Sequence, residues 1–89
     1  MPKWWTGLVV QGRGDYPSWV TSLAVCYTKN GKSWKNVDGG KVYQASKDQE
    51  LAVTIDFEEP VLARSLRIYP QTWHGAIAMR FDAVYVELP

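Results

Sequence analysis

Residues 68–80 read IYPQTWHGAIAMR and predict a strand, a turn and a second strand. Pro70 is expected to end the first strand, because proline cannot donate the hydrogen bond that a strand ladder needs. Gly75 marks the turn, and it directly follows two large side chains, Trp73 and His74. Side chains at turns are usually exposed. We therefore expect Trp73 and His74 to form a ligand-contacting surface on a rigid β scaffold.

The same alternation of apolar and polar residues continues outward from this stretch, and helical periodicity is almost absent. Asn30-Gly31 is a strong hairpin signal, and Glu58-Glu59-Pro60 is expected to end a strand. Short strands between turn residues predict an all-β sandwich or barrel, in one domain over residues 1–89. The expected strands are residues 6–11, 20–28, 33–37, 41–44, 51–57, 64–69 and 76–88.

Composition narrows the classes of function. The 89 residues include ten basic and nine acidic side chains, for a net charge of +1, which argues against a nucleic-acid-binding protein. The single cysteine, Cys26, excludes an intrachain disulfide, and its apolar surroundings predict a core residue. The N-terminal residues do not resemble a signal peptide, and no apolar run reaches the roughly 20 residues of a membrane span.

The sequence contains few of the residue patterns that catalysis requires. One histidine cannot build a multi-histidine metal site, and no CxxC or HxxxH spacing is present. Glu58 and Glu59 are neighbours on a predicted strand, so their carboxylates should point to opposite faces. We therefore expect no enzyme activity and no cofactor; a calcium ion is conceivable, but no residue pattern supports it.

The first long loop offers two readings. Arg13-Gly14-Asp15 spells the tripeptide that many integrins recognise, and it is set in a loop that could display it. Alternatively, Asp15 caps the turn and Arg13 lines a binding surface. Tyr16 and Trp19 flank Pro17, and loop aromatics supply contact area at a low entropic cost.

Two further side chains have open roles. Trp34 is expected to pack across strands. Arg67 and Arg80 either pair with acidic groups in the sandwich or present a guanidinium group to a ligand.

Four stretches, in order, resemble a discoidin-type domain, also called the coagulation-factor C-type domain. They are residues 6–15 (TGLVVQGRGD) with 19–22 (WVTS), 27–34 (YTKNGKSW), 41–44 (KVYQ), and 63–75 (ARSLRIYPQTWHG) with 77–80 (IAMR). The resemblance covers nearly the whole chain. It implies an antiparallel β-sandwich of jelly-roll, galactose-binding-like type, without catalysis, that works in extracellular or cell-surface adhesion.

The resemblance also implies a ligand site in the loops at one end of the sandwich. Members of the family bind galactose-type glycans or anionic phospholipids. Carried over to this chain, the ligand-binding residues would be Arg13, Asp15, Tyr16, Trp19, Trp73, His74 and Arg80. In the glycan reading the aromatic rings stack on a sugar and the polar groups bond its hydroxyls; in the lipid reading loop tips insert between anionic headgroups.

This chain departs from the family pattern in its length. The likeness is to the C-terminal portion of the domain, and the usual terminal cysteine pair is absent. Residues 44–48 (QASKD) replace the usual Gly-Asn-x-Asp, which puts any role of that loop in doubt. Sheet edges and apolar faces left uncovered favour self-association, so a homo-oligomer is a further expectation.

Overall fold

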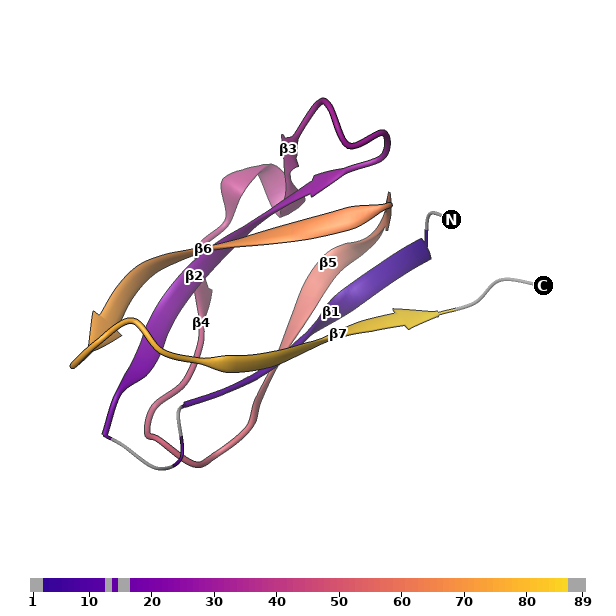
Figure 1. Ribbon diagram of the computed structural model, residues 1–89. Helices are drawn as coiled ribbons and strands as arrows, with labels where there is room; N and C mark the ends of the chain where they lie inside the picture. The colour runs from indigo at the N-terminus through magenta and orange to yellow at the C-terminus, as the bar shows by residue number, and fades with distance from the viewer. Residues whose placement is uncertain (1–2, 13, 15–16, 87–89) are drawn as a thin grey trace.

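The computed structural model describes residues 3–12, 14 and 17–86. Within them the chain forms two antiparallel sheets that face each other, with one short 3-10 turn, as Figure 1 shows. The predicted all-β sandwich is confirmed. The elements are β1 Lys3–Gln11, β2 Trp19–Thr28, β3 Lys35–Asn36, η1 Val37–Gly40, β4 Tyr43–Gln44, β5 Val53–Ala63, β6 Ser65–His74 and β7 Arg80–Val86.

Each sheet is organised around one central strand. In the first sheet β1 lies between β5 and β7. In the second, β2 pairs with β6 along its whole length, while β3 and β4 pair with separate parts of its other edge. All of these pairings are antiparallel, so strand ends gather at two opposite ends of the sandwich.

The core lies between the two sheets. Alternate residues of the two central strands point into it, which is the two-residue period of a strand with one buried face. Leu8 and Val10 of β1 are completely buried, as are Leu23 and Val25 of β2. The remaining core side chains are Val20, Val37, Tyr43, Ala45, Ile55 and Phe57.

Two ends of the sandwich matter for function. We call the loop end the region where the β1–β2, β4–β5 and β6–β7 connections meet, at the lower left of Figure 1. We call the hairpin end the opposite region, where the β2–β3 loop lies and β5 turns into β6. Gln11, Trp19, His74 and Arg80 are the terminal residues of their strands at the loop end.

The two prolines expected to end strands do not do so. β5 continues through Pro60 to Ala63, and β6 continues through Pro70 to His74. Each proline lies beside a register shift, one between Trp5 and Gly7 on β1 and one next to Leu23 on β2. Because a bulge interrupts the ladder there, the missing N–H of proline breaks no regular pairing.

This correction changes the context of the opening stretch. Trp73 and His74 belong to the last part of β6, and the turn begins at Gly75. The final strand begins at Arg80 instead of residue 76. The two aromatic side chains are therefore held by a strand ladder rather than by a turn.

Further predictions, about one strand's length and the surroundings of two side chains, need correction. The strand after the hairpin is reduced to Lys35–Asn36, and Trp34 precedes it as a half-buried residue whose ring lies 4.1 Å from the Arg67 guanidinium. Arg67 is thus stacked on an aromatic ring rather than paired with a carboxylate. Cys26 is only half-buried, because it lies on the outer face of β2, where its thiol donates to Asn36 Oδ1 at 3.1 Å.

Candidate functional site

The loop end is held together by contacts between segments that are distant in sequence. The Gln49 Nε2 atom donates to the Gly14 carbonyl oxygen at 3.1 Å, and the Gln11 side chain donates to the Glu50 carbonyl. Gly12 packs so tightly on the same loop that a Cβ there would lie 2.7 Å from the Asp48 carbonyl oxygen. The β1–β2 and β4–β5 connections therefore form one surface.

A carboxylate fixes the β4–β5 connection. Asp48 accepts hydrogen bonds from the backbone N–H groups of Leu51 at 2.7 Å and Glu50 at 2.8 Å. These bonds favour the charged form and lower the pKa of Asp48 below its ordinary value. Asp48 thus has a local structural role, in the segment where this chain departs from the family pattern.

Arg80 braces the β1–β2 connection from the first position of β7. Its Nε atom donates to the Gly12 carbonyl oxygen at 2.8 Å, and its guanidinium lies against Gly14. A positive φ of 85° at Gly14 turns the loop at this point. Among the described residues, the polar partner of Arg80 is this backbone carbonyl, and the side chain as a whole remains exposed.

The β6–β7 connection docks on the start of β2. Gly75 has a φ of 72°, and a Cβ there would lie 2.7 Å from Ser18 Oγ and 3.0 Å from the Pro17 carbonyl oxygen. The next backbone N–H, of Ala76, donates to Ser18 Oγ at 3.2 Å. Ser18 is completely buried by this contact. The docking fixes where β6 ends and hence where its last two side chains lie.

His74 is paired with Trp19, not with Trp73. The Trp19 and His74 rings stack with centroids 4.3 Å apart and planes inclined by 19°. The two residues are register partners in the β2–β6 ladder. Cross-strand partners share one face of a sheet, so both rings lie on the same side.

Trp73 lies on the other face of β6. Consecutive strand residues alternate between faces, and the register partner of Trp73 is the core residue Val20. At this end of the sandwich its side chain is still 47% exposed. The predicted Trp-His pair is thus divided into an exposed indole on one face and a stacked imidazole on the other.

The structure brings four of the seven predicted site residues to the loop end: Trp19, Trp73, His74 and Arg80. The other three, Arg13, Asp15 and Tyr16, lie outside the described residues. Gly14, between the first two, is described, and its carbonyl oxygen is occupied by Gln49.

Sequence reasoning missed a shallow cavity of about 200 Å³ beside Arg80. Gln11 and Arg80 are register partners on β1 and β7, and they line the cavity together with Val9, Phe81 and Asp82. Phe81 is 59% exposed. No local motif marks these residues; only the β1–β7 register, which sequence alone does not give, places them together.

The loop end therefore offers exposed aromatic rings beside amide, imidazole, guanidinium and carboxylate groups. Among the described residues, no three His, Cys, Asp or Glu side chains cluster as metal ligands would. The described part of the chain also lacks a helix long and apolar enough to cross a membrane. Aromatic rings beside a few polar groups suit reversible binding of a small polar ligand.

Comparison with known proteins gives a consistent result. The F5/8 type C domain family model matches residues 2–82. Discoidin-2 of Dictyostelium discoideum is 39% identical over 80 residues, covering 90% of this chain and 31% of the relative. Lactadherin of Mus musculus is 30% identical over 82 residues, covering 86% of this chain and 18% of the relative.

The solved structure of wild-type discoidin II from Dictyostelium discoideum superposes with a TM-score of 0.94 at 35% identity. That superposition covers 100% of this chain and 35% of the discoidin II chain. The chain thus spans roughly a third of the length of the discoidins that it matches.

Proposed function

Because the chain belongs to the F5/8 type C domain family, we propose that it is a non-catalytic, lectin-like adhesion module for galactose- or N-acetylgalactosamine-type glycans. The observation that carries this proposal is the 47% exposed Trp73 side chain at the end of β6. An indole held on a strand gives a rigid apolar surface on which the C–H face of a sugar can stack.

Polar groups near this indole would bond the sugar hydroxyls. His74 lies at the same end on the opposite face of β6, held by its stack on Trp19, and would contact the part of a glycan that extends around this end. Arg80 and its neighbours Gln11 and Asp82 line the cavity of about 200 Å³ at the same end of the sandwich. Ligand sites combine a mainly apolar surface with a few polar groups that set orientation, which is the combination found here. Arg13, Asp15 and Tyr16 complete the proposed site from the intervening loop.

A glycan array tests the proposal, probed with the purified, folded protein in calcium and again in chelator. Binding to galactose-type glycans under both conditions is expected. A folded protein that binds no glycan would overturn the proposal. Binding that disappears with chelator would add a calcium requirement, for which the described residues supply no cluster.

Anionic phospholipid membranes are the second candidate ligand. The observation that favours them is the exposure of Ile77 at 56% and Phe81 at 59%, both close to the loop end. Exposed apolar tips beside cationic groups are typical of peripheral membrane contacts. Sedimentation with phosphatidylserine liposomes, against phosphatidylcholine liposomes as control, separates this reading from glycan binding.

Adhesion through Arg13-Gly14-Asp15 is a third reading, and it requires the tripeptide to be displayed. A cell-adhesion assay with Asp15→Glu tests it, because this change keeps the charge and alters the reach of the carboxylate. Unchanged adhesion would exclude an integrin-type contact. All three readings place the chain outside the cell or at its surface.

Self-association is part of the proposal. Among the described strands β7 pairs only with β1, and Phe81, Tyr85 and Val86 on it are between 40% and 59% exposed. An edge strand with exposed apolar side chains favours pairing with a second copy. Sedimentation velocity over a concentration series is expected to show a dimer; a monomer at every concentration would exclude it.

A further inference from the structure

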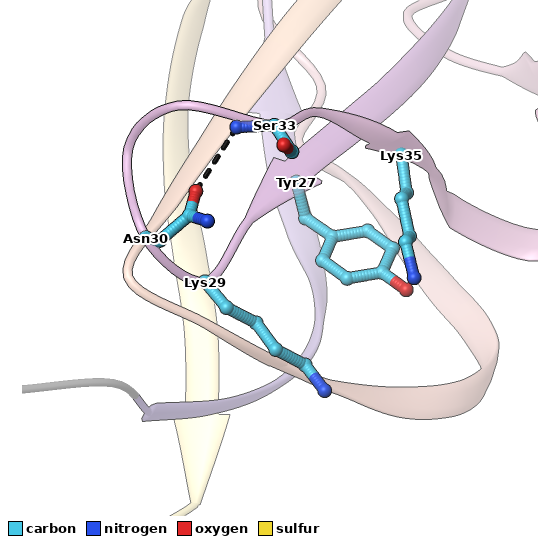
Figure 2. Close-up of a pocket in the computed structure, with 5 residues that line it drawn as sticks. All are labelled: Tyr27, Lys29, Asn30, Ser33 and Lys35. Carbon is cyan, nitrogen blue, oxygen red and sulfur yellow. Dashed lines mark hydrogen bonds between the residues drawn. The ribbon is translucent and has the colours of Figure 1, made fainter.

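The hairpin end carries a second cavity, of about 290 Å³, that is independent of the loop-end site. Its lining residues are Tyr27, Lys29, Asn30, Ser33 and Lys35, and we call it the lysine pocket. Figure 2 shows the two lysine side chains extending on either side of the Tyr27 ring, with their ammonium groups toward the side of the phenol oxygen. The pocket thus combines two cations with one aromatic ring.

Strand geometry explains why these side chains converge. Lys35 on β3 is the register partner of Tyr27 on β2, so the two share a face of the sheet. Lys29 follows Tyr27 by two residues, the spacing that returns to the same face of an extended chain. The Tyr27 ring also packs against the core, which anchors the floor of the pocket.

The loop that closes the pocket is held by its own hydrogen bonds. Asn30 Oδ1 accepts from the backbone N–H groups of Lys32 at 2.8 Å and Ser33 at 3.0 Å. Thr28, which is 1% exposed, accepts from the Gly31 N–H at 2.9 Å. Because the oxygen of the Asn30 amide is engaged in this way, its NH₂ group is the end left to face a ligand.

The charges around the pocket are mainly positive. Lys32 lies in the same loop, and the Arg64 guanidinium reaches the loop close to Gly31. Among the described residues, Lys41 forms an ion pair with Glu58 at 3.8 Å. This pair involves none of the pocket lysines. In the part of the chain that the structure describes, neither Lys29 nor Lys35 forms an ion pair with a carboxylate, so both ammonium groups can contact a ligand.

A neighbouring cavity limits where the charged group of a ligand can lie. It measures about 340 Å³, shares Tyr27 and Lys29 with the lysine pocket, and also carries Asp38 and Glu59. Carboxylates repel an anionic group, so only the lysine pocket suits one. A ligand that spans both cavities would place its anion between Lys29 and Lys35 and its uncharged hydroxyls beside Asp38 and Glu59.

We propose that the lysine pocket binds a sulfate group of a sulfated glycan. Two ammonium groups and an amide NH₂ group match the oxygens of a sulfate ester, and charge-assisted hydrogen bonds are the stronger ones. The Tyr27 ring gives the sugar a stacking surface. A membrane fits less well, because the lining residues include no aliphatic side chain that could insert into lipid.

The proposed site differs from the loop-end site in both place and ligand. A sulfated heparin oligosaccharide should bind by calorimetry, and its desulfated counterpart should bind much more weakly. Lys29→Gln and Lys35→Gln should each weaken the affinity about fivefold, the upper range for an exposed ion pair. Raising the salt concentration should weaken binding as well, because the charges are exposed.

Lys47→Gln is the matched control, because Lys47 is an exposed lysine in the β4–β5 connection at the other end. It should bind the oligosaccharide as the wild type does. Tyr27→Ala tests the stacking surface and should weaken binding, with circular dichroism to show that the fold is kept. If the alanine variant unfolds, Tyr27→Leu replaces it, because leucine removes the ring but keeps an apolar side chain against the core.

Three results would overturn the proposal. The first is equal binding by the sulfated and desulfated oligosaccharides. The second is equal affinity of Lys29→Gln, Lys35→Gln and Lys47→Gln. The third is binding to phosphatidylserine vesicles without any binding to the oligosaccharide, which would assign the lysine pocket to a lipid headgroup. Loss of galactose binding in the array leaves this test unaffected, because it uses a different ligand and different residues.

Discussion

The Trp19 indole and the His74 imidazole stack with centroids 4.3 Å apart, across the first residue of β2 and the last residue of β6. This contact joins two strand ends that the sequence separates by more than half of the chain. It also holds the imidazole from one side, so that His74 is pre-positioned at the loop end. Pre-positioned side chains bind ligands more tightly, because less freedom is lost on binding.

The stack predicts different outcomes for two His74 variants. His74→Phe keeps an aromatic ring on Trp19 but removes the polar nitrogen atoms, so it should retain stability and lose affinity for sugar. His74→Ala should lose affinity and also about 0.5–1.5 kcal/mol of unfolding free energy, the usual contribution of an aromatic pair. Chemical denaturation and sugar titration measure both quantities. Wild-type affinity in both variants would remove His74 from the site.

A pair of glycine variants tests the docking of the β6–β7 connection. Gly75 and Gly39 both have positive φ values, of 72° and 68°. Replacement by alanine should cost each about 1–2 kcal/mol in backbone strain. Gly75→Ala should cost more, because its Cβ would lie 2.7 Å from Ser18 Oγ, whereas nothing lies within 4 Å of a Cβ on Gly39.

Urea denaturation of the two glycine variants gives the comparison directly. The difference between them isolates the contacts with Ser18 and the Pro17 carbonyl, since the backbone strain is common to both. Equal stability would show that the connection does not dock on Ser18.

The environment of Tyr43 predicts that the free energy of unfolding depends on pH in the alkaline range. The Tyr43 hydroxyl donates to the Asp38 carboxylate, and burial, followed by that hydrogen bond, raises the pKa of Tyr43 well above its ordinary value. A raised pKa stabilises the fold below the unfolded pKa of about 10, and this stabilisation is lost as the pH rises toward the folded value.

The matched variant is Tyr43→Phe, which should lose about 1–2 kcal/mol at neutral pH. The difference in unfolding free energy between wild type and variant should shrink as the pH rises above about 10. Using the difference removes the contributions of the other tyrosines and lysines. A difference that stays constant from pH 7 to strongly alkaline pH would contradict the assigned hydrogen bond.

The environment of Asp48 predicts that the stability of the fold falls with decreasing pH in the acid range. Its pKa is lowered by the hydrogen bonds from Leu51 and Glu50, so its contribution is present above the unfolded pKa and is lost as the pH falls through the folded value. The amide proton resonances of both residues should therefore shift with a midpoint below about 3.9, the ordinary aspartate value. Asp48→Asn should abolish the titration; a midpoint at or above that value would exclude the two hydrogen bonds.

The periodicity of apolar residues predicted most of the fold. Within the expected strands 20–28 and 51–57, alternation puts Leu23 with Val25 and Ile55 with Phe57 on one face, and the structure buries both pairs in the core. Leu51 begins the expected strand 51–57 and has the same parity as Ile55 and Phe57, but it is 65% exposed, since β5 begins only at Val53.

Features that depend on pairing could not be read from the sequence. Pro60 and Pro70 looked like strand ends, and only the register shifts beside them, which appear once β5 pairs with β1 and β6 with β2, show why they are tolerated. The division of Trp73 from His74 has the same origin, since it depends on where β6 ends. The shallow cavity beside Arg80 and the lysine pocket likewise depend on the register of β7 and β3.

The most direct test of the proposed glycan site compares two tryptophans at opposite ends of the molecule. Trp73 is exposed at the loop end, and Trp34 lies against Arg67 just before β3 at the hairpin end. Galactose titrations of the wild type, Trp73→Ala and Trp34→Ala by calorimetry decide the matter. We predict that Trp73→Ala loses at least about tenfold in affinity, as expected when a stacking ring worth about 1.4 kcal/mol or more is removed, and that Trp34→Ala binds as the wild type does. Equal binding by the two variants would contradict the account.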